Sequence, residues 1–178
     1  MMEKPRIATL WLDGCSGCHM SLLDMDERLL EIAGKIELVY SPVVDAKEFP
    51  DSVDLTLVEG AIASDEDVEK ITRVRSKTKI LVALGDCAVT GNVPAMRNNF
   101  VLEDVLTRGY VENATANQGA PTHEVPKLEP KVIPLHECVT VDLFVPGCPP
   151  SANLIYFVLS EVLAGRVPDL ATRSRFGN

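Results

Sequence analysis

Two cysteines three residues apart are the first place in this 178-residue chain where the side chains could do chemistry. Cys15 and Cys18 stand beside Gly14 and Gly17, directly after the apolar run 7–12, which is typical of a buried strand. Thiolates at this spacing can hold a metal ion or an iron–sulfur cluster, or they can exchange disulfides as in a thioredoxin-like motif. Further cysteines brought to the same turn would favour metal binding.

The apolar pattern predicts strands that alternate with helices. Strands are expected at residues 7–12, 36–40, 53–59, 79–84 and 139–145, and helices at 20–33, 64–77, 100–107 and 151–163. This alternation predicts the α/β fold class, with a doubly wound, mainly parallel sheet and helices on both faces. Residues 108–137 hold four prolines and predict a Pro-rich loop excursion that lies against a partner, within one domain over 1–178.

The same sheet would bring four cysteines to one edge. Cys15 and Cys18 follow the first strand, Cys87 the fourth and Cys148 the fifth, and parallel sheets bind ligands beyond the carboxyl ends of their strands. Alone, Cys87 or Cys148 would more often be a small buried side chain. Four converging thiolates fit an iron–sulfur cluster or a tetrahedral zinc, and a single C-x-x-C favours the cluster. Cys138 precedes the fifth strand, toward the opposite edge, and is predicted not to be a ligand.

Other polar residues near this edge have weaker signals. Glu59 ends the third strand, where a carboxylate could relay protons or accept backbone hydrogen bonds, and the residues alone favour the structural role. His19 could donate to a cluster sulfur or cap a helix, and Asp86 is expected to be a turn or cap residue.

Composition excludes several classes of protein. The formal net charge of −9 argues against a nucleic-acid partner, which needs a basic face. No apolar run approaches the roughly 20 residues of a membrane span. The sequence shows no signal peptide, so the cytoplasm is the expected compartment, where a disulfide framework is not expected.

Four motifs together resemble one protein family. In chain order they are Cys15-Ser16-Gly17-Cys18, Val58-Glu59-Gly60-Ala61-Ile62, Gly85-Asp86-Cys87-Ala88 and Pro146-Gly147-Cys148-Pro149-Pro150. They resemble the small subunit of nickel–iron hydrogenases, which is related to the cluster-bearing 20-kDa subunit of respiratory complex I. Residues 11–26 and 92–98 are similar to the small subunit of the bidirectional, NAD-reducing hydrogenase. Uptake hydrogenases usually have Glu where Gly14 stands, so no role of that Glu carries over.

The resemblance implies a flavodoxin-like fold and one 4Fe–4S cluster held by Cys15, Cys18, Cys87 and Cys148. It implies a nickel–iron centre in a separate large subunit. Electrons from hydrogen oxidation would pass through this chain toward flavin/iron–sulfur diaphorase subunits and NAD. The chain would thus be a subunit of a hydrogen:NAD+ oxidoreductase (hydrogen dehydrogenase) and not catalytic alone.

The family also suggests that Glu59 lies near the cluster as a candidate proton relay, and that FMN binds near this subunit in some members. Two alternatives stay open. One is a related hydrogenase or quinone oxidoreductase subunit that uses another acceptor, such as a deazaflavin, ferredoxin or quinone. The other is a zinc-stabilised binding module without redox function.

Overall fold

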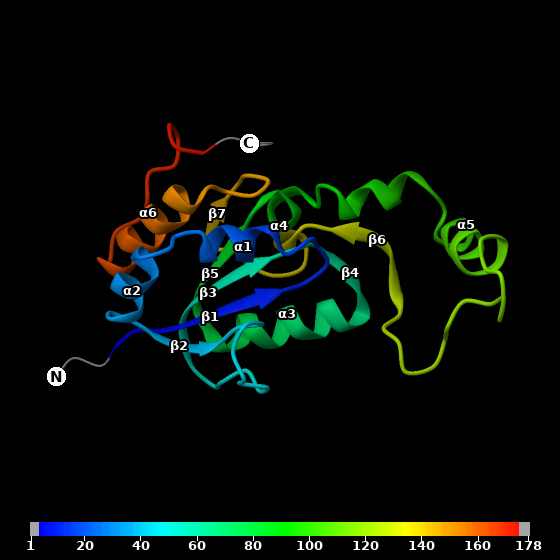
Figure 1. Ribbon diagram of the computed structural model, residues 1–178, viewed down its shortest axis with the longest axis horizontal. Coiled ribbons are helices and arrows are strands. Elements are labelled where there is room, and N and C mark those ends of the chain that lie inside the picture. Colours follow the sequence, from blue (N-terminus) through cyan, green and yellow to red (C-terminus); the bar gives the residue numbers. More distant parts are fainter. Residues whose placement is uncertain (1–3, 175–178) are drawn as a thin grey trace.

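A five-stranded parallel sheet forms the centre of the molecule (Figure 1). The computed structural model describes residues 4–174. The strands lie in the order β2-β1-β3-β5-β7, and every neighbouring pair is parallel. Their bounds are Arg6–Trp11 for β1, Glu37–Tyr40 for β2, Val53–Glu59 for β3, Thr78–Leu84 for β5 and Leu143–Val145 for β7. The predicted α/β fold class is confirmed, and the strand order is that of a flavodoxin-like sheet.

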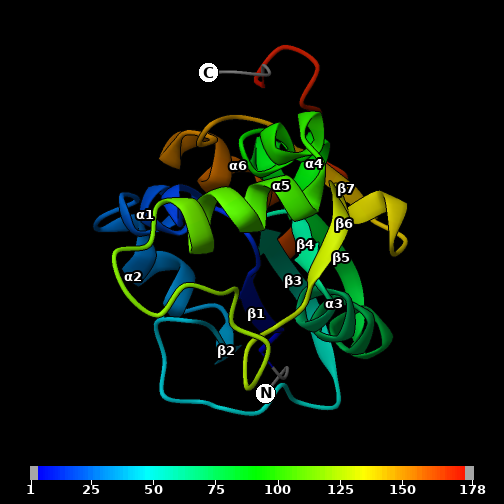
Figure 2. The ribbon, with the colours of Figure 1, turned by 90° about the vertical axis from the view of Figure 1, so that its right-hand side faces the viewer.

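Helices cover both faces of the sheet (Figure 2), because its central strands are apolar on both sides. Helices α1, α2 and α6 pack over one face, and α3 and α4 over the other. Successive side chains of a strand point to opposite faces of the sheet. Leu57 therefore packs in the core beneath α1, α2 and α6, and Val58 packs in the core beneath α3 and α4. The helix bounds are Gly17–Leu23 for α1, Arg28–Ala33 for α2, Asp65–Lys77 for α3, Asp86–Thr90 for α4 and Ala152–Leu163 for α6.

The helix predicted over residues 20–33 is in fact two helices, α1 and α2. Between them, Asp26 has a φ of +52°, a left-handed conformation that a continuous right-handed helix does not contain. The turn lets Met25 reach the core, where it is 3% exposed.

A small second sheet was absent from the sequence prediction. Strand β4 (Ile62–Ser64) pairs antiparallel with β6 (Leu128–Ile133). Pro130 lies within β6, which is compatible with a strand that has a partner on one side. The stretch 108–137 is therefore more ordered than a loop excursion alone.

The predicted strand over residues 139–145 was too long, because β7 covers only its last three residues. Just before β7, the Asp142 side chain accepts a hydrogen bond at 2.7 Å from the backbone N–H of Leu81. The Asp142 carboxylate thus pairs with the Leu81 N–H, which a backbone carbonyl would accept from if β7 began earlier.

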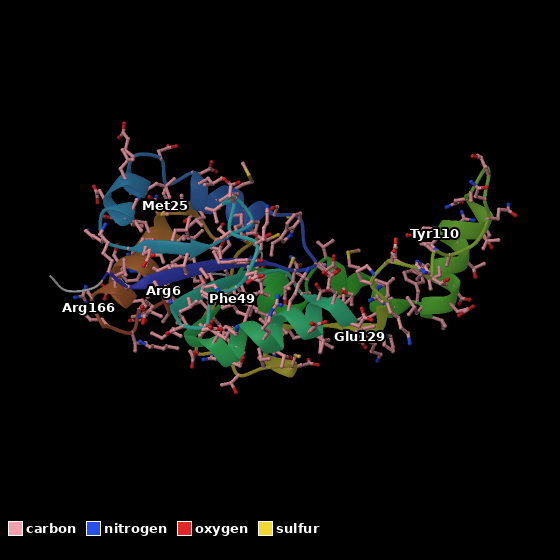
Figure 3. The ribbon with its side chains drawn as sticks, turned by 90° about the horizontal axis from the view of Figure 1, so that it is seen from below. Arg6, Met25, Phe49, Tyr110, Glu129 and Arg166 are labelled. Carbon is pink, nitrogen blue, oxygen red and sulfur yellow. The ribbon has the colours of Figure 1, made fainter. Side chains whose placement is uncertain are left out.

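The segment after α4 extends away from the body of the molecule (Figure 1). It contains the 3-10 helix η1, helix α5, the π-helical turn η2 and the irregular residues 113–127. Figure 3 shows Tyr110 of η2 near its far end. The bounds are Pro94–Asn99 for η1, Leu102–Thr107 for α5, Arg108–Glu112 for η2 and, after β6, Leu135–Glu137 for the 3-10 helix η3. Within residues 4–174, no helix has both the length and the apolar character needed to cross a membrane.

Candidate metal centre

The carboxyl ends of four strands lie in one row. The register pairs Trp11 with Glu59, Glu59 with Leu84, and Leu84 with Val145. These four residues end β1, β3, β5 and β7. Any residue that closely follows one of these ends must therefore lie along the same rim of the sheet.

The four candidate cysteines occupy this rim. Cys15 and Cys18 follow β1, with Cys18 already in the first turn of α1, while Cys87 lies in α4 and Cys148 follows β7. Cys15 and Cys148 are exposed and the other two are half-buried. Cys138 lies elsewhere, after η3, where it packs against the core on the α3 side.

Electrostatics ties the four thiols together. Burial is the largest cause that raises the pKa of Cys18 well above its ordinary value. Negative charge nearby raises it further, from Glu59, Cys87, Cys15 and Cys148 in that order. Burial also raises the pKa of Cys87, and the charges of Cys148 and Cys15 raise it further. Negative charge on the neighbouring thiols therefore disfavours the thiolates of Cys18 and Cys87. A cationic metal centre would reverse that effect, because binding deprotonates thiols.

The backbone leaves room for closely spaced sulfurs. Gly85 has a φ of +85°, and a Cβ at this position would collide with Sγ of Cys18. A glycine is therefore required both by the backbone conformation and by the adjacent sulfur. Among the described residues, no group of three or more His, Cys, Asp or Glu side chains converges on a point that could hold a single metal ion.

Asp86 fastens the Cys87 segment to the Cys148 loop. Its Oδ1 accepts a hydrogen bond from the Gly147 N–H at 2.7 Å, and its own N–H donates to the Gly147 carbonyl at 2.8 Å. Asp86 is 5% exposed, so water competes little for these bonds. The sequence predicted a turn or cap residue and missed this cross-link.

Glu59 holds the first turn of α1. Its Oε2 accepts from the backbone N–H of His19 at 2.6 Å and lies 2.8 Å from Nδ1 of the same residue. The α1 N-cap residue, Ser16, makes no side-chain capping bond, so a carboxylate from β3 satisfies an N–H that the helix leaves unpaired. Glu59 is 2% exposed. This geometry supports the structural role expected from the residues alone.

His19 extends this contact into a buried polar chain. Its Nε2 lies 2.9 Å from Thr9 Oγ1, which donates to Ser41 Oγ at 2.8 Å. The imidazole therefore binds neither a sulfur nor a helix end, contrary to both roles considered for it. No sequence motif links these residues, because they come from β1, α1, β3 and the end of β2.

Comparison with known proteins gives consistent matches. The family described as NADH ubiquinone oxidoreductase, 20 Kd subunit, matches residues 15–162. The NAD-reducing hydrogenase HoxS subunit delta of Cupriavidus necator is 45% identical over 172 residues, which cover 94% of this chain and 82% of that protein. A subunit of the F420-non-reducing hydrogenase vhu of Methanocaldococcus jannaschii is 39% identical over 170 residues, covering 94% of this chain but 59% of that protein.

A solved structure matches over nearly the full length. A chain in the crystal structure of an NAD+-reducing nickel–iron hydrogenase in the H2-reduced state superposes with a TM-score of 0.94. It is 38% identical, and the match covers 99% of this chain and 100% of that one. A nickel–iron–selenium hydrogenase from Desulfovibrio vulgaris Hildenborough, at 18% identity and a TM-score of 0.62, shares the fold.

Proposed function

This chain belongs to the NADH ubiquinone oxidoreductase 20 kDa subunit family, and we propose that it is the electron-transfer small subunit of an NAD-reducing nickel–iron hydrogenase. The observation that carries this proposal is the meeting of Cys15, Cys18, Cys87 and Cys148 at one sheet rim, in a chain that superposes at a TM-score of 0.94 on one from an NAD+-reducing hydrogenase.

The residues at the rim fit a 4Fe–4S cluster. Four thiolates are the usual ligand set of such a cluster, which supplies one-electron transfer when bound. A single tetrahedral zinc would need all four sulfurs about 2.3 Å from one ion. This chain has one C-x-x-C pair and two isolated cysteines, a spacing that favours a cluster over a zinc site. The chain's own task is to hold the four sulfurs, chiefly through the Asp86–Gly147 cross-link and the room left at Gly85.

Exposure at the rim supports a partner that covers it. Cys15 and Cys148 are exposed. Large apolar side chains near the rim and on the following segment are exposed too: Trp11, Met20, Val93, Met96 and Phe100. Such a patch is typical of a protein interface. We propose that the partner here is the hydrogenase large subunit with its nickel–iron centre, and that diaphorase subunits with flavin and iron–sulfur centres accept the electrons and reduce NAD.

The assignment of ligands is tested by iron content. Cys148→Ala in the purified complex should lose about four irons per chain and the hydrogen-dependent reduction of NAD. Cys138→Ala, the matched control, should keep both. Unchanged iron in Cys148→Ala would refute the ligand set. A wild-type chain with zinc and no absorption near ~400 nm that dithionite bleaches would favour the zinc module instead.

The alternative is that the electrons pass to an acceptor other than NAD. Several relatives at 37–39% identity favour considering it, because they are subunits of F420-non-reducing hydrogenases. Copurification separates the two functions. A nucleotide-binding diaphorase in the complex supports NAD, and its absence together with reduction of a ferredoxin or quinone supports the alternative.

We also propose a place to look for the expected FMN. A cavity of about 930 Å³ lies between the body and the extended segment, lined in part by Trp11, Arg97, Tyr110 and Lys127. Its aromatic rings could stack on a flavin and its cations could contact a phosphate, although carboxylates line it as well. Flavin fluorescence released by acid from the pair formed with the large subunit tests this, with Trp11→Ala expected to lower it.

A cytoplasmic location, tested by cell fractionation, completes the proposal.

A further inference from the structure

Asn92 lies against two of the four rim cysteines. Its side-chain nitrogen Nδ2 donates a hydrogen bond to Sγ of Cys148 at 3.4 Å. The same side chain also hydrogen-bonds Cys87, as does the backbone of Val93. One amide group therefore contacts a sulfur of α4 and a sulfur of the loop after β7.

The backbone explains how the amide reaches this place. Gly91 ends α4 with a φ of +84°, and Asn92 follows with a φ of +34°. A Cβ at Gly91 would lie 2.9 Å from the Cβ of Ala95, so both the space and the positive φ favour a glycine there. The turn directs residue 92 back toward the helix that carries Cys87.

The residue type goes beyond what the turn needs. A left-handed conformation is most easily adopted by glycine, and asparagine is one of the few other residues that adopt it readily. Glycine would satisfy the backbone at position 92 without a side chain. Asparagine at this position adds a side-chain N–H donor next to the sulfurs of Cys148 and Cys87.

We propose that Asn92 sets the reduction potential of the cluster by donating hydrogen bonds from its side-chain amide to Sγ of Cys148 and Cys87. This inference rests on the proposed function. Hydrogen bonds to the sulfurs are one of the protein's means of tuning such a centre. One added electron makes the cysteine sulfurs more negative, so an N–H donor stabilises the reduced form more than the oxidised form. Asn92 transfers neither a proton nor an electron when the cluster is reduced. It is therefore a positioning residue and not a catalytic one.

The test is a potentiometric titration of the intact complex, followed by EPR. The signal of this cluster is identified as the one that Cys148→Ala removes. Asn92→Gly keeps the backbone conformation and removes the donor, so it should lower the equilibrium constant for one-electron reduction about tenfold, or about 59 mV for a one-electron couple. Asn92→Asp replaces the donor by a carboxylate and should shift the potential further in the same direction.

Asn117→Gly is the matched control. Asn117 also has a left-handed backbone, with a φ of +52°, but it is exposed on the extended segment. Its replacement makes the same chemical change in the same conformation and should leave the potential unchanged.

The outcomes separate this inference from the proposed function. If the wild-type complex holds no iron on this chain, the proposed function fails. If iron is present and Asn92→Gly titrates like the wild type, or shifts to a higher potential, only this inference is overturned. Loss of iron in Asn92→Gly would also overturn it, because the amide would then be needed to hold the cluster.

Discussion

Replacing Glu59 should loosen the first turn of α1 before it affects anything else. In Glu59→Ala, the backbone N–H and the ring Nδ1 of His19 both lose the oxygen at 2.6 and 2.8 Å. A buried donor without a partner costs about 1–3 kcal/mol. Loss of the partner of the backbone N–H, together with the ring contact, should therefore cost about 3 kcal/mol, the upper end of that range.

Hydrogen exchange measures this local effect without unfolding the complex. A loss of about 3 kcal/mol corresponds to roughly 100-fold faster exchange, since each 1.4 kcal/mol is tenfold. The peptide that contains residues 17–23 should therefore exchange about 100-fold faster in Glu59→Ala. Glu66→Ala is the control, because Glu66 is partly exposed on α3 and pairs with Lys70 at the surface.

Glu59→Gln distinguishes holding α1 from proton relay. Its amide oxygen can take the place of Oε2 and keep both contacts with His19. Exchange in α1 should then stay close to that of the wild type, and hydrogen-dependent NAD reduction should persist if the role is structural. Normal exchange with lost activity would favour proton relay. Exchange in Glu59→Ala equal to that of the wild type would refute the reasoning.

Two further predictions concern other polar contacts. Asp86→Ala leaves the buried N–H of Gly147 unpaired, which should cost about 2 kcal/mol, and the Cys148 loop should be cleaved faster in limited proteolysis of the complex. Lys79, by a side-chain hydrogen bond, and Arg6, by its backbone N–H, lower the pKa of Asp54 below its ordinary 3.8. A lowered folded-state pKa gives stability that is present above pH 3.8 and is lost as the pH falls through the folded value. Asp54→Asn should thus lower the thermal midpoint at pH 7 by a few degrees at most, as for a screened surface pair, and the difference should vanish once the pH lies below the folded-state pKa.

The sheet and the meeting of the cysteines could be predicted because both follow from one-dimensional patterns. Apolar runs separated by amphipathic stretches identify parallel strands, and each cysteine stands a few residues after such a run. The helix predicted over residues 64–77 is α3, which begins at a capping box between Ser64 and Asp67. The break between α1 and α2 was not predicted, because it depends on the conformation of Asp26, a residue that also occurs within helices.

The contacts that surround the cysteines were beyond the sequence because each joins residues far apart in the chain. Glu59 and His19 are 40 residues apart, Asn92 and Cys148 are 56 apart, and Asp86 and Gly147 are 61 apart. In each case a short polar side chain reaches across the row of strand ends, where the register has already brought two loops together. Sequence position alone therefore predicts that the four cysteines meet at one rim, while the groups that contact them follow only from the register of the sheet. A change of register by one residue would turn Glu59 to the opposite face of β3, and would remove the support of α1 while leaving every cysteine motif intact.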